Sequence, residues 1–438
     1  MKRKRKVLIL LLAPCALFLF LEIAVRVVID LPAKTDFYAS IRRDEIPFYQ
    51  EKFGVRTNSG PDWIHLGWIA DPEKQRYAVF RIEPAGETRV AETRYGSCLV
   101  ENLEPGSRYL FRVQSGDGAF DHTVACATAQ HRRAAAMTPR IASAWRPVFR
   151  PSKTGDYLND HTVFRSHDGV WHIVGITAFG EGDYAKEKYF AHGVSREFPP
   201  PEGSMMEERD PVADFGRLAW APHVIVEDRY YLWFSPHRAY LATSTDGYAW
   251  KEEGDRSFLP HNPQFRDPMV FKVAQRQWLM YATARDGYYS SVDAYQSFDL
   301  AHWQYIGPAL AMGWGAERAG AQSSAESPFV FAHNGRYFLS VTYNNDSFFW
   351  NPLLLSLGVW PDRGSYNETL VLRSTNPYSF GTYRGKGNSP ALAAVLEAHA
   401  PEYIFTGGKW YITTAGWPWV ASLTKGEVAV AELDWKED

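Results

Sequence analysis

Three carboxylic acids, Asp160, Asp267 and Glu326, occupy corresponding points in a pattern that this sequence repeats. Each lies eleven residues before the aromatic residue that opens an aromatic-rich segment, and Trp220 and His399 lie at the same point in two further copies. Two carboxyl groups that flank a glycosidic bond can cleave it, because one protonates the leaving oxygen while the other attacks the sugar or activates water. A third carboxylate can raise the pKa of the acid and stabilise the cationic transition state.

An acid before a strand often serves only the turn, but three acids in register are harder to explain in that way. We therefore predict three catalytic residues. Asp160 is expected to act as nucleophile or general base and Glu326 as general acid. Asp267 is expected to tune the acid and stabilise the transition state.

The elements that must position these acids are five pairs of short strands. In each pair an apolar segment is followed by a turn and an aromatic-rich segment, and the second segments begin at Trp171, Tyr231, Trp278, Tyr337 and Trp410. Tyr, Trp, Phe, Val and Ile favour strands, and repeats of this kind are typical of a β-propeller. No sustained apolar period of 3.6 residues indicates a helical solenoid. The sequence predicts an all-β protein with a five-bladed β-propeller over residues 145–438.

Several short motifs in this region resemble the five-bladed propeller glycoside hydrolases of families 43, 32 and 68. Asn159-Asp160 is similar to the nucleophile motif of family 32, although His161 stands where that family has Pro. Arg266-Asp267-Pro268 matches the Arg-Asp-Pro motif, and Glu326-Ser327-Pro328 resembles the acid-bearing Glu-Cys-Pro motif. Trp220-Ala221-Pro222 is closer to family 43.

The resemblance implies a glycoside hydrolase that acts on an oligosaccharide or polysaccharide. It also implies a substrate-binding set, namely Asn159, Trp220, Arg266, His399 and Glu402. No cofactor is expected to be required. A structural calcium or sodium ion near His399 is compatible with family 43, but a neutral core histidine explains that residue equally well. Glu402 fits either a strand cap or the wall of the pocket.

The N-terminus begins with the basic segment MKRKRK and continues with an apolar run over residues 7–21. This pattern predicts a transmembrane signal anchor over residues 1–30, with the basic side in the cytoplasm and the folded part outside it. Residues 31–59 are mixed and charged, which is typical of a stalk. We therefore expect a membrane-anchored protein on the periplasmic side or the cell surface.

Residues 60–130 alternate apolar and polar side chains, as a small β-sandwich does. The segment from Leu103 to Val113, with Tyr109 after Pro105-Gly106, resembles the corner of a fibronectin type III domain, in which a Tyr bonds back across the corner. Such modules more often space or orient a catalytic domain than bind substrate. Cys98 and Cys126 could pair or remain free thiols, and residues 131–144 are expected to be a linker.

The formal charge of −3, from 47 basic and 50 acidic side chains, gives no indication of nucleic-acid binding. Two alternatives to hydrolysis stay open. The propeller could bind carbohydrate without cleaving it, or it could transfer the sugar to another sugar, because transfer and hydrolysis share their first step. The sugar, the linkage and the stereochemical outcome are not specified by the sequence.

Overall fold

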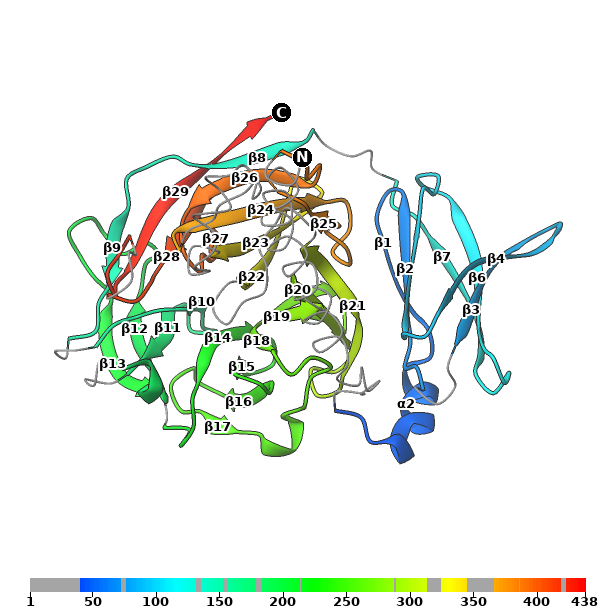
Figure 1. The fold of residues 1–438 in the computed structure, drawn as a ribbon, viewed down its shortest axis with the longest axis horizontal. Helices are drawn as coiled ribbons and strands as arrows, with labels where there is room; N and C mark the ends of the chain where they lie inside the picture. The colour runs from blue at the N-terminus through cyan, green and yellow to red at the C-terminus, as the bar shows by residue number, and fades with distance from the viewer. Residues whose placement is uncertain are drawn as a thin grey trace, which may run out of the picture.

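The chain forms five β-sheets arranged around a common axis, with a small β-sandwich beside them, in the computed structural model (Figure 1). The structure describes residues 40–71, 76–130, 135–152, 156–178, 183–212, 214–286, 289–312, 324–344, 366–385, 387–418 and 423–438.

Each of the five sheets, here called blades 1 to 5, consists mainly of antiparallel strands that follow one another in the chain. The arrangement is that of a five-bladed β-propeller, as the sequence predicts. Blade 1 contains β10 (His161–Arg165), β11 (Trp171–Thr177), β12 (Tyr189–Ser195) and β13 (Glu207–Val212). Blade 2 contains β14 (Trp220–Val226), β15 (Tyr230–Ser235), β16 (Tyr240–Ser244) and β17 (Lys251–Glu252). Blade 3 contains β18 (Arg266–Ala274), β19 (Gln277–Asp286), β20 (Tyr289–Ser297), β21 (Trp303–Met312) and the parallel β25 (Thr382–Tyr383). Blade 4 contains β22 (Ser324–His333), β23 (Arg336–Asn344), β24 (Glu368–Ser374) and β26 (Leu392–Glu397).

Blade 5 is built from both ends of the propeller sequence. Its strands β27 (Tyr403–Thr406), β28 (Lys409–Thr414) and β29 (Val428–Glu437) come from the C-terminus. On the outer side, β29 pairs with β8 (Met137–Ile141) and with β9 (Arg146–Phe149). The structure differs here from the predicted boundaries, because β8 lies inside the segment 131–144 that was expected to be a linker.

Apolar side chains fill each of the five gaps between neighbouring blades. Between blades 2 and 3, for example, the indole rings of Trp233 and Trp303 meet edge to face, with their centroids 5.6 Å apart. Burial of large aromatic rings contributes strongly to core stability. Most of the many aromatic residues therefore serve the packing of the blades.

The N-terminal sandwich consists of two sheets. One contains β1 (Arg56–Ser59), β2 (Trp63–Gly67) and β5 (Ser97–Glu101), and the other contains β4 (Gly86–Thr93), β3 (Tyr77–Glu83), β6 (Arg108–Ser115) and β7 (Asp121–Ala127) in that order. The hydroxyl of Tyr109 accepts a hydrogen bond of 2.9 Å from the backbone N–H of Glu104. This side chain therefore bridges the corner before β6, as the sequence predicts. Cys98 and Cys126 are free thiols.

The sandwich packs directly against blades 3 and 4 (Figure 1). The Trp63 indole is buried in the core between these blades, and its N–H donates to the carbonyl of Thr375 at 2.7 Å. The ring of His65 stacks on Tyr378 at 3.6 Å, and the amide of Gln296 donates to the carbonyl of Trp68 at 3.1 Å. The sandwich is thus docked on the propeller, with Trp63 as part of the core between blades 3 and 4.

The predicted stalk over residues 31–59 contains regular structure in its described part. The helix α2 (Ile46–Phe53) buries Ile46, Tyr49 and Phe53, and β1 is a strand of the sandwich. The predicted anchor over residues 1–30 lies outside the described residues. Among the residues that the structure does describe, no helix is both long and apolar enough to cross a membrane.

Candidate active site

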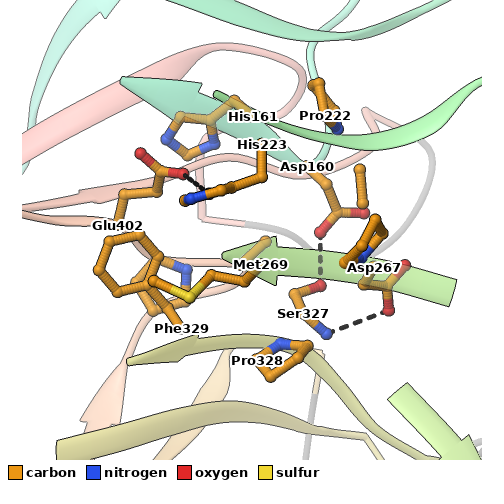
Figure 2. Close-up of a pocket in the computed structure, with 14 residues that line it drawn as sticks. Asp160, His161, Pro222, His223, Asp267, Met269, Ser327, Pro328, Phe329 and Glu402 are labelled. Carbon is orange, nitrogen blue, oxygen red and sulfur yellow. Dashed lines mark hydrogen bonds and ion pairs between the residues drawn. The ribbon is translucent and has the colours of Figure 1, made fainter. Parts of the chain in front are cut away.

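A small cavity of about 30 Å³ lies at the centre of the propeller. It has two ends with different side chains (Figure 2). We call the part formed by Asp160, Asp267 and Ser327 the acid end, and the part formed by His161, His223 and Glu402 the histidine end. A central cavity lined by a few polar groups is a common form of small-molecule site.

A left-handed residue at or near the start of four inner strands shapes the centre of the propeller. In blades 2 to 5 a residue with positive φ stands directly before a proline, namely Ala221 (φ 45°), Asp267 (55°), Ser327 (49°) and Ala400 (44°). Left-handed backbone is uncommon for residues other than glycine. The pairing register shifts at this point in blades 2, 3 and 4. The inner strand pairs of blades 1 and 5 keep a constant register, and Asp160 immediately precedes β10.

The bulges correct the predicted equivalence of the three acids. Arg266, not Asp267, occupies the position of Glu326, because each directly precedes the left-handed residue and the proline. Asp267 is itself the left-handed residue and corresponds to Ser327. In blade 3 the residue eleven positions before Trp278 is Asp267 and not Arg266. The reason is a second bulge, between Lys272 and Ala274, which adds a residue to the hairpin. Alignment on the prolines would have given the correct register.

The three acids nevertheless meet through two intermediate residues. The hydroxyl of Ser327 donates to Oδ1 of Asp160 at 2.5 Å, and its backbone N–H donates to Oδ2 of Asp267 at 3.1 Å. Nη2 of Arg266 donates to Oε1 of Glu326 at 2.9 Å, and its Nε lies 3.6 Å from Oδ2 of Asp267. The three inner-strand segments of blades 1, 3 and 4 thus form one network of carboxyl groups.

The electrostatics of the network favour a bound proton near neutral pH. Burial raises the pKa of Asp160 to about 6, although the hydrogen bond from Ser327 acts in the opposite direction. Burial also raises the pKa of Asp267 to about 7, and the charges of Asp160 and Glu326 add to this effect. Neighbouring carboxyl groups titrate as a unit. Such perturbed groups are common at sites of acid/base chemistry.

The predicted substrate-binding residues occupy different environments. Asn159 is buried, and its Oδ1 accepts a hydrogen bond of 2.9 Å from the hydroxyl of Tyr366 and lies 3.1 Å from Nε2 of His399. Its Nδ2 lies 3.4 Å from Oδ2 of Asp160. Trp220 is half-buried at the first residue of β14. Asn159 and His399 therefore contact other protein groups next to Asp160.

Glu402 lies at the histidine end, away from Asp160 and Asp267 (Figure 2). Its Oε2 accepts a hydrogen bond of 2.5 Å from the backbone N–H of Val163, and its Oε1 lies 3.7 Å from Nδ1 of His223. The carbonyl of Val270 accepts from Nε2 of His223 at 3.0 Å. These contacts join strands of blades 5, 1, 2 and 3.

An ion held directly by His399 does not fit these contacts. Its Nδ1 lies 3.0 Å from the carbonyl oxygen of Tyr366, and its Nε2 faces Asn159. Both ring nitrogens are therefore directed at protein oxygens rather than at the cavity. In the described part of the chain, no group of three or more His, Cys, Asp or Glu residues is arranged to hold a metal.

A fourth carboxyl group, Glu187, was not identified from the sequence. Its side chain is 1% exposed, and Oε1 accepts hydrogen bonds from the hydroxyl of Tyr157 at 2.7 Å and from the indole of Trp417 at 2.9 Å. Its backbone carbonyl accepts from the N–H of Ala219, next to Trp220. Burial raises the pKa of Glu187 to about 7, and the charge of Asp160 contributes. Glu187 lies outside the repeated segments, so the pattern carried no signal for it.

Two comparisons of sequence bear on this site. The family model described as the glycosyl hydrolases family 32 N-terminal domain matches residues 222–322. This match confirms the resemblance to propeller glycoside hydrolases for the part of the chain that contains Arg266 and Asp267. Among curated proteins, none matches the sequence.

Solved structures with a similar fold include members of families 43 and 32. The chain is 17% identical to a family 43 β-xylosidase/α-arabinofuranosidase from a compost microbial metagenome, over 67% of this chain and 94% of that one (TM-score 0.43). It is 15% identical to a family 43 enzyme from Xanthomonas citri, over 66% and 89% (TM-score 0.43). It is 15% identical to a family 32 β-fructofuranosidase from Bombyx mori, over 66% and 62% (TM-score 0.44). By the family 32 match and its sequence motifs, the chain is thus similar to the propeller glycoside hydrolases.

Proposed function

We propose that this protein is a glycoside hydrolase whose reaction takes place at the acid end of the cavity. The observation that carries the proposal is the contact of Ser327 with Asp160 and Asp267, beside the pair of Arg266 and Glu326. This network brings three carboxyl groups from blades 1, 3 and 4 to one place. Cleavage of a glycosidic bond requires two such groups on either side of the bond.

Each acid has a separate role in this proposal. Glu326 is the general acid, because its side chain is 20% exposed whereas that of Asp267 is 7% exposed, so Glu326 can reach a leaving oxygen. Asp160 is the nucleophile or general base. Asp267 is held by the Thr283 hydroxyl at 2.8 Å and by Ser327, and its charge stabilises the cationic sugar. The mechanism needs a proton on the general acid while the nucleophile or base is ionised.

The test is a screen for hydrolysis with the wild type and two variants. The substrates are aryl β-xylosides, aryl α-L-arabinofuranosides and β-fructofuranosides, the classes named for the family 43 and 32 enzymes above. We expect turnover of at least one class, and a fall in kcat of about 10³-fold or more in Asp160→Asn. Asp168→Asn is the matched control, because Asp168 is exposed in a turn of the same blade. Normal turnover in Asp160→Asn would contradict the assignment. Binding of oligosaccharides without any turnover would favour a carbohydrate-binding propeller.

The N-terminal region supports a further part of the proposal. We infer that the sandwich is a fibronectin type III-like module, supported by its three-stranded and four-stranded sheets and by the Tyr109 corner. We further propose that residues 1–30 anchor the protein in a membrane and that the propeller faces away from the cytoplasm. Membrane fractionation and protease accessibility in intact cells test this arrangement. Full-length protein in the soluble fraction would contradict it.

A further inference from the structure

Ser327 contacts both aspartates of the acid end, one through its side chain and one through its backbone (Figure 2). The hydroxyl donates to Asp160 at 2.5 Å, and the N–H donates to Asp267 at 3.1 Å. Asp160 comes from blade 1 and Asp267 from blade 3, whereas Ser327 belongs to blade 4. One residue therefore fixes two carboxyl groups that come from other sheets.

The bulge itself does not require a hydroxyl group at this position. Ala221 and Ala400 occupy the corresponding points of blades 2 and 5, with φ of 45° and 44°, close to the 49° of Ser327. Alanine thus adopts the same left-handed backbone in the same setting twice. The presence of serine in blade 4 is explained by the carboxylate that its hydroxyl meets.

The hydrogen bond from the Ser327 hydroxyl also affects the ionisation of Asp160. A donor that points at a carboxylate favours the ionised form, so Ser327 opposes the effect of burial on Asp160. The bond occupies Oδ1 of Asp160 and leaves Oδ2 with a longer contact of 3.4 Å to Nδ2 of Asn159. Of the two oxygens, Oδ2 is therefore the one better placed to react.

We propose that Ser327 is a positioning residue that keeps Asp160 ionised, turns its Oδ2 toward the substrate and sets its placement relative to Asp267. The inference rests on the proposed function only for the role of Asp160 in turnover. The contact between Ser327 and Asp160 can be tested without any substrate.

The experiment compares Ser327→Ala, Ser327→Cys and the wild type as full-length protein. The alanine variant is expected to fold, because alanine fills the same position in two other blades. The titration of Asp160 is followed by ¹³C NMR of labelled aspartate carboxyls, with its resonance identified by loss in Asp160→Asn. In Ser327→Ala we expect this titration to move to higher pH by about one unit, since a hydrogen bond to a charged group is lost. The weaker thiol donor of Ser327→Cys should give a smaller shift.

Kinetics on the substrate found in the screen provide the second measurement. The acid limb of kcat/KM should move upward with the titration, and kcat should fall about 10- to 100-fold with little change in KM. Ser340→Ala is the control, because Ser340 is a buried serine of the same blade whose hydroxyl donates to the carbonyl of Phe329 at 3.4 Å instead of to a carboxylate of the acid end. An unchanged Asp160 titration in Ser327→Ala would overturn the inference. A shifted titration in a protein that hydrolyses no substrate would support the inference and overturn the proposed function.

Discussion

The two ends of the central cavity both contain ionisable side chains, but these side chains have different kinds of partner. At the histidine end, Glu402 and His223 form hydrogen bonds to backbone groups of neighbouring blades. At the acid end, the carboxyls of Asp160, Asp267 and Glu326 contact serine, threonine and arginine side chains and one backbone N–H, all near one another. A carboxylate that accepts from the backbone of another blade holds the fold together, whereas burial of the neighbouring Asp160 and Asp267 raises their pKa values and opposes folding in their ionised forms. The partners of a polar residue, more than its type, indicate its role.

Among the variants that test this comparison, Glu326→Gln is expected to change kcat the most. The amide keeps the shape of the side chain but cannot protonate the leaving oxygen, so kcat should fall about 10²- to 10⁴-fold. Aryl glycosides with activated leaving groups need no proton and should recover most of this loss. The measurement is kcat against the pKa of the leaving phenol. An equal loss for all leaving groups would exclude Glu326 as the acid.

The second test applies to the histidine end. Glu402→Leu removes the acceptor of the Val163 N–H, which should lower the free energy of unfolding by about 2 kcal/mol. Glu402→Gln retains an acceptor oxygen and should lose less than half of that. Urea denaturation measures both, and the kcat of the folded protein should stay within a few-fold of wild type. A loss of activity above 100-fold with unchanged stability would show that Glu402 belongs functionally to the acid end.

The smallest effect is a gain in stability from Asp267→Asn. The folded-state pKa of about 7 lies above the ordinary value of 3.8, so ionisation of Asp267 opposes folding, and this cost appears as the pH rises from about 4 to 7. The variant removes the cost and should melt a few degrees higher than wild type at pH 8, with little difference at pH 4. Activity should fall at both values. Calorimetry at the two pH values makes the comparison, and equal shifts at both would contradict it.

The sequence predicted the five blades because each one repeats a local pattern of strand, turn and aromatic strand. It did not predict β8 as a strand of blade 5, because the partner of β8 is at the far end of the chain. The repeated pattern predicted that the three acids lie close together, and they do. It aligned Asp267 with Glu326, however, whereas Arg266 is the equivalent residue, because a bulge in blade 3 alters the spacing. The contacts of Ser327 and Glu187 depend on tertiary packing and have no sequence period.

The pairing of β29 with β8 has a consequence for the synthesis of the protein. During translation, β8 emerges from the ribosome before the four blades that follow it, and its partner is the last strand to be made. The ring therefore remains open until β29 has been made, since contacts between such distant segments form late. Asp438, the last residue, is bonded to Thr138 at 2.5 Å and lies 2.7 Å from Arg373. Deletion of residues 434–438 would remove most of the pairing with β8 and so weaken the closure of the ring, although the pairing of β29 with β9 would remain.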